Sequence, residues 1–222
     1  MLARTGSVAL VGGMDPRVRD VAIGTKGFMP PDEGDALWAA AIDAARRVPG
    51  RPFVEVGSYC GRSTVWLGAA ARECGTVVQA VDHHGGSEEN QPGWEWHDES
   101  LVDAATGRIN TLPHFRATIA RAGLTDVVFE EVGESTAVAA RLAGLASLVF
   151  VDGGHGREVA RADWLAWSPK VASGGLLAIH DVFEDPADGG QAPFEEIYQP
   201  ALQAGFVEIS RCGSLRVLVA PN

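Results

Sequence analysis

Residues 53–64 read Phe53-Val54-Glu55-Val56-Gly57-Ser58-Tyr59-Cys60-Gly61-Arg62-Ser63-Thr64. An apolar run here leads into a turn with two glycines, and an amphipathic helical pattern follows. Gly57 and Gly61 have no Cβ, so the backbone at these positions can pass close to a bound ligand. Ser63 is placed to cap the following helix. A strand, a glycine turn and a helix N-terminus in this order are typical of a nucleotide-type site.

The glycine spacing separates the ligand families that use such a turn. A P-loop needs GxxxxGK[ST], but no lysine follows Gly61. A dinucleotide-binding fingerprint needs G-x-G-x-x-G, whereas this turn has only Gly57-x-x-x-Gly61, with Glu55 just before it. The E-x-G-x-x-x-G pattern resembles the first motif of class I S-adenosylmethionine-dependent methyltransferases. This resemblance implies an enzyme that binds S-adenosylmethionine at the turn.

Strand and helix patterns alternate from residue 52 onward, as expected when helices join parallel strands. The predicted strands are residues 52–56, 77–81, 127–132, 148–152, 176–180, 206–210 and 215–220. The predicted linking helices are residues 63–72, 113–122, 136–142, 157–167 and 193–204. Residues 211–214 are too few for a parallel crossover, so the last two strands must form an antiparallel hairpin. We expect an α/β, Rossmann-like methyltransferase fold with a mostly parallel seven-stranded sheet, a C-terminal antiparallel hairpin and helices on both faces.

Two segments fall outside this alternation within a single predicted domain, residues 1–222. Residues 1–48 form an N-terminal cap segment, with a helix predicted over 35–47. Residues 85–111 are polar and too long for an ordinary connection, and we interpret them as a lid-like insertion. Trp94 and Trp96 in this insertion could present an aromatic surface to a planar acceptor, or could pack against the same domain or a second subunit. A homo-oligomer is therefore left open.

The composition excludes several classes of partner. The formal net charge is -11 and the pI is near 4.9, which disfavours nucleic-acid substrates because no basic cluster offsets the acidic surface. No stretch approaches the roughly 18 apolar residues of a membrane span, and the N-terminus lacks the core of a secretory signal. The three cysteines are far apart and indicate neither disulfides nor a metal knuckle. We expect a cytoplasmic protein with a small-molecule acceptor and no membrane partner.

Asp82 is the candidate for binding the ribose of the cofactor. It follows an apolar strand, about 20 residues beyond the first glycine, where an acid can accept both ribose hydroxyls. Glu134 and Ser135 follow another strand, at a position where the resemblance implies contact with adenine. The predicted cofactor-binding residues are Glu55, Gly57, Ser58, Tyr59, Gly61, Ser63, Asp82, His83, Glu134, Ser135, Asp152 and Gly153.

Asp152 and Asp181 each follow an apolar strand, and the two strands are predicted to be neighbours. Both acids should therefore lie at the carboxyl edge of the sheet, where open α/β folds bind ligands. The order Val-Asp-Gly-Gly-His, then a helix with Asp163-Trp164, then Gly174-Gly175 and His180-Asp181 resembles macrolide-sugar O-methyltransferases and cephalosporin-hydroxylase-like proteins over about residues 50–183. This resemblance implies small-molecule O-methylation.

The same resemblance implies roles for individual residues. Acids matching Asp152 and an acidic pair matching His180-Asp181 hold Mg²⁺ in such relatives, and the histidine matching His155 is the general base. His155 could take a proton from an acceptor hydroxyl near neutral pH. The predicted catalytic residues are His155 and Asp152, and the predicted metal ligands are Asp152, His180 and Asp181. His180 replaces the first acid of the pair, which weakens the prediction of Mg²⁺ because this ion prefers oxygen ligands.

Other functions fit parts of this pattern. A nicotinamide-dependent oxidoreductase would share the fold, but its glycine fingerprint and a Tyr-x-x-x-Lys pair are missing. A metal-dependent hydrolase or hydroxylase could use Asp152, His155 and Asp181. A non-catalytic subunit could keep the cofactor fold alone. The acceptor itself, whether a sugar hydroxyl, a phenol or a carboxylate, is not named by the sequence.

Overall fold

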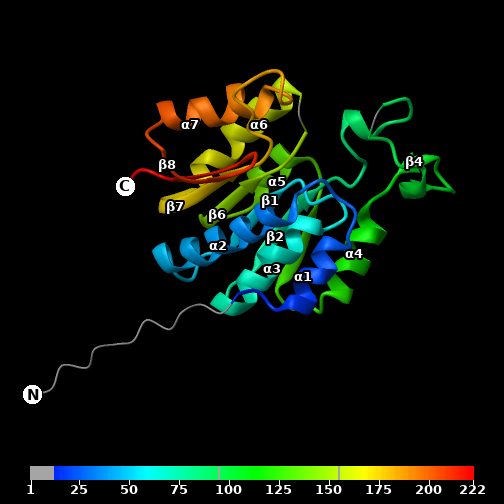
Figure 1. The fold of residues 1–222 in the computed structure, drawn as a ribbon, viewed down its shortest axis with the longest axis horizontal. Coiled ribbons are helices and arrows are strands. Elements are labelled where there is room, and N and C mark those ends of the chain that lie inside the picture. Colours follow the sequence, from blue (N-terminus) through cyan, green and yellow to red (C-terminus); the bar gives the residue numbers. More distant parts are fainter. Residues whose placement is uncertain (1–12, 95, 155) are drawn as a thin grey trace, which may run out of the picture.

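The structure is a computed structural model that describes residues 13–94, 96–154 and 156–222. A seven-stranded sheet runs through its centre (Figure 1). The strands of this sheet are β1 (Phe53–Val56), β2 (Val78–Asp82), β5 (Val128–Val132), β6 (Ala146–Val151), β7 (Val171–Ile179), β8 (Val207–Cys212) and β9 (Leu215–Val219). They lie in the order β5-β2-β1-β6-β7-β9-β8.

The pairing of the strands confirms the predicted fold class. β5, β2, β1, β6 and β7 are parallel to one another. β9 lies between β7 and β8 and is antiparallel to both, so the C-terminal hairpin enters the sheet with its last strand inserted. Because β1, β2, β6 and β7 all end at the same edge, the loops that follow them converge there.

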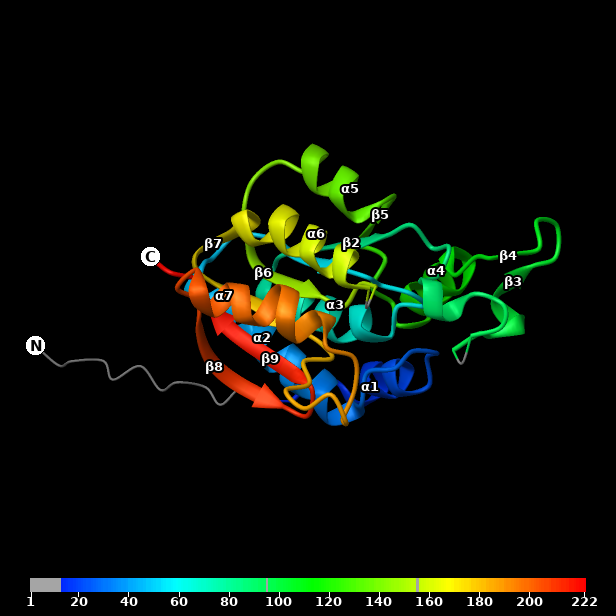
Figure 2. The same cartoon turned by 90° about the horizontal axis from the view of Figure 1, so that it is seen from above.

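Helices cover both faces of the sheet, as predicted (Figure 2). On one face lie α1 (Pro16–Ile23), α2 (Pro31–Arg47), α3 (Arg62–Cys74) and α4 (Leu112–Arg121). The other face carries α5 (Ser135–Arg141), α6 (Arg157–Trp167), the π-helix η4 (Phe194–Tyr198) and α7 (Gln199–Gln203).

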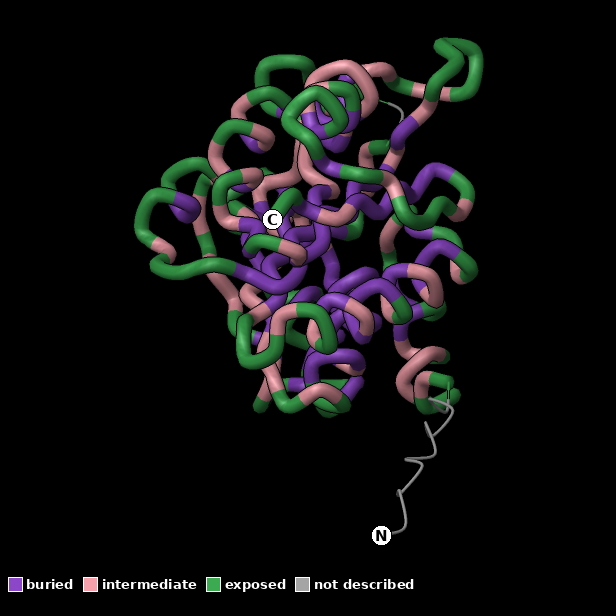
Figure 3. The backbone as a smooth tube through the Cα atoms, turned by 90° about the vertical axis from the view of Figure 1, so that its left-hand side faces the viewer, coloured by how far each residue is buried: buried purple, intermediate pink, exposed green. Residues whose placement is uncertain are grey.

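Alternate side chains of each central strand enter different cores. Leu148 and Phe150 pack under α2 and α3, whereas Val149 and Val151 pack under α6. All of β6 is buried, and the buried residues gather in the middle of the molecule (Figure 3). Burial on both faces explains why these parallel strands read as continuous apolar runs rather than alternating ones.

Three local features differ from the sequence predictions. The helix expected over 35–47 begins earlier, at Pro31, and α1 precedes it without having been predicted. Residues 193–204 form a π-helix before the α-helix. The strand expected over 176–180 begins earlier, at Val171, and its pairing with β6 shifts register before Leu176. A Cβ on Gly175 would lie 2.9 Å from two carbonyl oxygens, so the shifted backbone requires glycine there.

The insertion at residues 85–111 stands away from the sheet (Figures 1 and 2). It contains two short 3-10 helices, η1 (Glu88–Asn90) and η2 (Glu99–Leu101), and the small hairpin β3 (Val102–Asp103) and β4 (Arg108–Ile109). Among the described residues, no helix is long and apolar enough to span a membrane.

Candidate active site

The cofactor loop, residues 57–61, connects β1 to α3 at the carboxyl edge of the sheet. Gly57 and Gly61 have φ values of 90° and 89°, in the left-handed region that favours glycine. A Cβ on Gly57 would lie 2.1 Å from the carbonyl oxygen of Asp152. The close backbone approach that the structure shows at Gly57 is to the end of β6.

Asp82 holds the cofactor loop in place. Its Oδ2 atom accepts hydrogen bonds from the backbone N–H groups of Ser58, at 3.0 Å, and Tyr59, at 2.7 Å. Its Oδ1 atom accepts one from the N–H of His84, at 2.6 Å. A carboxylate oxygen has two lone pairs, so Oδ1 keeps capacity to accept a further hydrogen bond from a ligand. The Oγ atom of Ser58 is buried and has no hydrogen-bond partner among the described residues.

Three of the described residues other than glycine adopt positive φ values, and all three follow strands at this edge. Tyr59 has φ 47° after β1, His84 has φ 59° after β2, and Asp181 has φ 53° after β7. Each such conformation costs about 1–3 kcal/mol and persists only where the surroundings impose it. Their gathering at one edge of the sheet is typical of a functional site.

Glu55 and Ser63, both predicted to contact the cofactor, bond to each other. Glu55 is fully buried, and its two carboxylate oxygens accept hydrogen bonds from the hydroxyls of Ser63, at 2.6 Å, and Thr64, at 2.5 Å. Ser63 is not the helix cap that the sequence indicated, because α3 begins at Arg62 and Gly61 occupies the cap position. These bonds join β1 to α3 beneath the cofactor loop. Burial raises the pKa of Glu55 to about 8.

The remaining predicted cofactor residues lie around the same edge. His83 is exposed, and its Nδ1 atom accepts a hydrogen bond from the N–H of Gly85. Glu134 is exposed just before α5. Ser135 donates a hydrogen bond to Asp163 and accepts one from the indole of Trp167. Ser135 therefore bonds within the fold rather than standing free.

Asp163 is a buried acid whose role the sequence did not indicate. It lies on α6 next to the backbone of Gly153, and a Cβ on Gly153 would lie 2.7 Å from its Oδ2 atom. Burial raises the pKa of the Asp163 carboxyl to about 6. Together with Asp152, Gly153 and His180, it lines a pocket between the ends of β6 and β7 and the π-helix.

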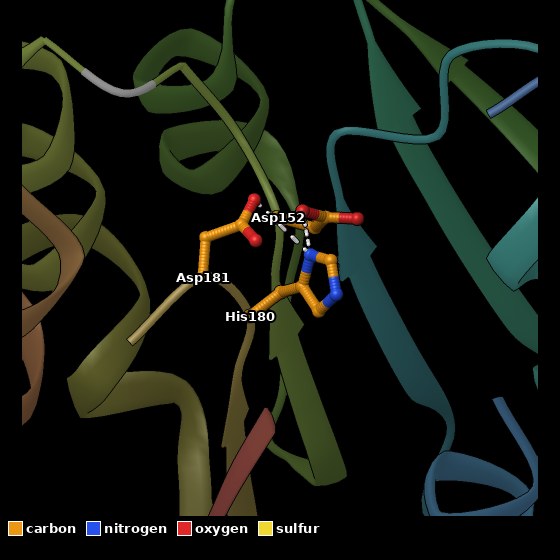
Figure 4. Close-up of side chains that lie close together, drawn as sticks. All are labelled: Asp152, His180 and Asp181. Atoms are coloured by element: carbon orange, nitrogen blue, oxygen red, sulfur yellow. Dashed lines mark hydrogen bonds and ion pairs between the residues drawn. The ribbon is translucent and has the colours of Figure 1, made fainter. Parts of the chain in front are cut away.

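The three predicted metal ligands come together at the ends of β6 and β7 (Figure 4). The Nδ1 atom of His180 lies 3.0 Å from Asp152 Oδ1 and 3.3 Å from Asp181 Oδ2. One ligand atom from each residue lies within 4.8 Å of those of the other two. We name Asp152, His180 and Asp181 the acidic-histidine centre.

Glu33, on the first turn of α2, contacts this centre from the opposite side of the imidazole. Its Oε2 atom lies 2.7 Å from His180 Nε2, and its Oε1 atom accepts a hydrogen bond from the N–H of Ser214, at 2.7 Å. Gly213 packs so closely that a Cβ there would lie 2.0 Å from Glu33 Oε1. Sequence analysis missed Glu33, because an acid in the first turn of a helix is common and carries no sign of a distant partner.

The imidazole of His180 has carboxylates at both of its nitrogens. Burial lowers the pKa of His180, but the charge of Asp152 and the hydrogen bonds to Asp152, Asp181 and Glu33 outweigh burial and hold it well above its usual value. The acidic-histidine centre therefore favours a positive charge on or beside the imidazole.

Aromatic side chains from three segments meet beside the cofactor loop. The ring of Phe28 lies 5.7 Å from that of Tyr59 and 5.3 Å from that of Trp96, centroid to centroid. Phe28 is 56% exposed and Trp96 is 49% exposed. Lys26 bonds to Asp98 and Ser100, which ties the N-terminal segment to the insertion. Trp94 is also exposed. His155, the predicted base, lies outside the described residues.

Comparison with known proteins agrees with this geometry. Residues 54–182 match the family described as a methyltransferase domain. Among solved structures, the chain is similar to the O-methyltransferase NovP, with 15% identity, 86% of this chain and 81% of that chain covered, and a TM-score of 0.66. The SAH-bound methyltransferase PaMTH1 from Podospora anserina has 12% identity, coverage of 95% and 90%, and a TM-score of 0.64.

Cofactor-bound Rv0187 from MTB gives 21% identity, coverage of 96% and 94%, and a TM-score of 0.62. At these identities the solved structures establish the fold, which is the one predicted. The family match covers more than half of the 222 residues. The chain therefore belongs to the methyltransferase domain family.

Proposed function

We propose that the protein transfers a methyl group from S-adenosylmethionine to an oxygen atom of a small-molecule acceptor. The observation that carries this proposal is the bonding of Asp82 to the cofactor loop, because it places an acid and a glycine turn together at the carboxyl edge of the sheet. The family match and the SAH-bound state of PaMTH1 support the choice of cofactor.

The residues around the loop fit such a cofactor. Asp82 Oδ1 would accept a hydrogen bond from a ribose hydroxyl, and the buried Ser58 Oγ supplies a hydroxyl that no described residue uses. Glu134 and Ser135 remain our candidates for contact with the adenine, and His83 and Gly153 for other contacts with the cofactor. Ser63 and Glu55 support the loop through their mutual hydrogen bond.

S-adenosylmethionine supplies a methyl group on a positively charged sulfur; the acceptor oxygen gains it and S-adenosylhomocysteine is the product. Such a transfer requires the nucleophile, the methyl group and the sulfur to lie in line, so positioning contributes much of the rate. His155 remains our proposed general base, which would take the acceptor proton. Asp152 lies at the junction of the cofactor loop and the pocket, where an acceptor hydroxyl would meet the cofactor.

The acidic-histidine centre fits a divalent ion, because two carboxylates and one imidazole nitrogen converge within 4.8 Å. A bound ion would lower the pKa of an acceptor hydroxyl and help its deprotonation. Asp152, His180 and Asp181 would hold such an ion.

The acceptor is proposed to be small and planar. Phe28 and Trp96 are half exposed next to Tyr59 of the cofactor loop, and aromatic rings favour stacking or edge contacts with another ring. The net charge of -11 disfavours a nucleic acid. We further infer that residues 85–111 act as a lid and residues 1–48 as a cap on one domain, in a cytoplasmic protein whose oligomeric state is open.

A methyl-transfer assay tests this function. The full chain is incubated with S-adenosylmethionine labelled in the methyl group and with a panel of catechols, phenols, sugars and carboxylic acids. We expect label in at least one hydroxyl acceptor. The rate of label transfer should fall by about 100-fold or more in a His155→Gln variant that still binds S-adenosylhomocysteine. Label only in amines, or in no acceptor of the panel despite cofactor binding, would count against O-methylation.

A further inference from the structure

His180 is held from both sides of its ring. It is 3% exposed, with Glu33 at Nε2 and with Asp152 and Asp181 at Nδ1. Its neighbours come from α2, from the end of β6 and from the residue that follows it in the chain. The ring therefore has a fixed orientation, which the local sequence alone would not provide.

The contact with Glu33 fixes a hydrogen on Nε2 of the imidazole. Glu33 Oε1 already accepts the backbone N–H of Ser214, and its Oε2 lies 2.7 Å from Nε2. Carboxylate oxygens have only lone pairs to offer, so Nε2 must supply the hydrogen in this contact. Nδ1 faces Asp152 and Asp181, which also offer only lone pairs, so either a second hydrogen or a metal ion lies between Nδ1 and these oxygens. In metal sites, a histidine ligand usually donates its other N–H to a carboxylate in this way.

The separations at Nδ1 are those of adjacent ligands around one ion. Ligands about 2.1 Å from an octahedral metal and at right angles to each other lie about 3 Å apart. Nδ1 lies 3.0 Å from the Asp152 oxygen and 3.3 Å from the Asp181 oxygen. Three electron-rich atoms at these distances need a positive charge among them. A hydrogen on Nδ1 provides it when no metal is bound, and a metal ion that binds Nδ1 displaces this hydrogen.

We propose that the acidic-histidine centre selects a divalent first-row transition ion over Mg²⁺, with His180 Nδ1 as a ligand and Glu33 as the positioning residue. Mg²⁺ prefers oxygen ligands, whereas imidazole nitrogen suits transition ions. His180 stands where the resembling methyltransferases have an acid, so this chain exchanges an oxygen donor for a nitrogen donor. The inference rests on the proposed metal site of the methyltransferase, but its test requires no methyl transfer.

Metal titration of the chelator-treated full chain tests the selection. Calorimetry with MnCl₂, CoCl₂ and MgCl₂ should give affinities for Mn²⁺ and Co²⁺ about tenfold or more above that for Mg²⁺. The visible absorption of bound Co²⁺ reports on a nitrogen ligand. In His180→Asp, which restores an oxygen donor, we expect Co²⁺ affinity to fall, its spectrum to change and the preference to move toward Mg²⁺.

Glu33→Gln tests the positioning residue. An amide can point its NH₂ group toward Nε2, so the tautomer is no longer fixed, and Co²⁺ affinity should fall about 10- to 100-fold. Asp43→Asn is the matched control, because it alters a half-exposed acid of the same helix, paired with Arg47 and outside the centre, and should leave Co²⁺ affinity unchanged. Circular dichroism and S-adenosylhomocysteine binding establish that each variant is folded.

Several results would overturn the inference. These are equal affinities for Mg²⁺ and Co²⁺ in the unmodified chain, no binding of any of the three ions, or an unchanged Co²⁺ spectrum in His180→Asp. A chain that binds S-adenosylhomocysteine but no transition ion would remove only this inference. A chain that binds Co²⁺ selectively but neither S-adenosylmethionine nor S-adenosylhomocysteine would remove the proposed function and leave the metal selection standing.

Discussion

The backbone of Gly57 packs directly against that of Asp152, and a Cβ added at Gly57 would lie 2.1 Å from the Asp152 carbonyl oxygen. The contact joins the cofactor loop after β1 to the end of β6. Asp152, which follows β6, is one of the three residues of the acidic-histidine centre. The two parts of the site therefore depend on each other for their placement.

Gly57→Ala should lower the free energy of unfolding by about 3 kcal/mol, because it adds both a strained φ and a clash with backbone. Gly50→Ala is the control. Gly50 also has a positive φ, 75°, but a Cβ added there would meet no atom within 4 Å, so only about 1 kcal/mol should be lost. Urea unfolding compares the two, and equal losses would show that the contact with Asp152 is unimportant.

Glu55 should make stability depend on pH. Burial raises its pKa from 4.5 to about 8, so the folded chain binds the proton more tightly than the unfolded chain does. The contribution of Glu55 to the free energy of unfolding is then highest below about pH 4.5. It falls by several kcal/mol in total as the pH rises through about 8.

Glu55→Gln carries no charge and should remove this fall. Asp163 also has a raised pKa, about 6, so the fall in stability that it causes takes place at lower pH than the fall caused by Glu55. Between about pH 6.5 and about pH 8.5 His180 also contributes a fall, because its pKa is raised as well, so the difference between the urea-unfolding stability curves of the variant and the unmodified chain measures Glu55. Parallel stability curves for the variant and the unmodified chain in this interval would contradict a protonated Glu55.

Arg62 anchors the N-terminal segment to the cofactor loop. Its guanidinium donates hydrogen bonds to the carbonyl oxygens of Met29, Ile23 and Thr25, at 2.8 to 3.0 Å. Arg62→Ala should cost about 2–4 kcal/mol, because the part-buried carbonyl oxygens of Met29 and Thr25 lose their donor. Arg62→Lys, which offers a single ammonium, should recover part of this loss. Limited proteolysis should cut the segment before Pro31 faster in the alanine variant, and unchanged cleavage would argue against the anchor.

The sequence predicted the parts of this fold that local patterns determine. Apolar runs predicted the strands. The alternation of strands and helices places the ends of parallel strands at one edge of the sheet, so the acids that end these runs, Asp82, Asp152 and Asp181, could be placed there. The short linker before Leu215 gave the hairpin. Asp15 and Pro16 could have revealed α1, since Asp15 accepts a hydrogen bond from the N–H of Arg17 and proline favours the first helical position.

Contacts between distant segments could not be predicted in this way. Glu33 and His180 are 147 residues apart, and nothing near either residue indicates the other. Ser63 carries a pattern typical of a helix cap, but the buried carboxylate of Glu55 competes for its hydroxyl. Asp163 was noted only as part of a motif, and its burial depends on the packing of α6 against the sheet.

Binding of the cofactor tests the account most directly. S-adenosylhomocysteine is titrated into the full chain, into Asp82→Asn and into the control Asp126→Asn, an exposed acid paired with Arg72. We expect micromolar binding to the full chain and to the control. The affinity of Asp82→Asn should be lower by about tenfold or more, because its amide nitrogen cannot accept a hydrogen bond. Absence of binding to the unmodified chain, or equal binding to Asp82→Asn, would contradict the proposed methyltransferase site.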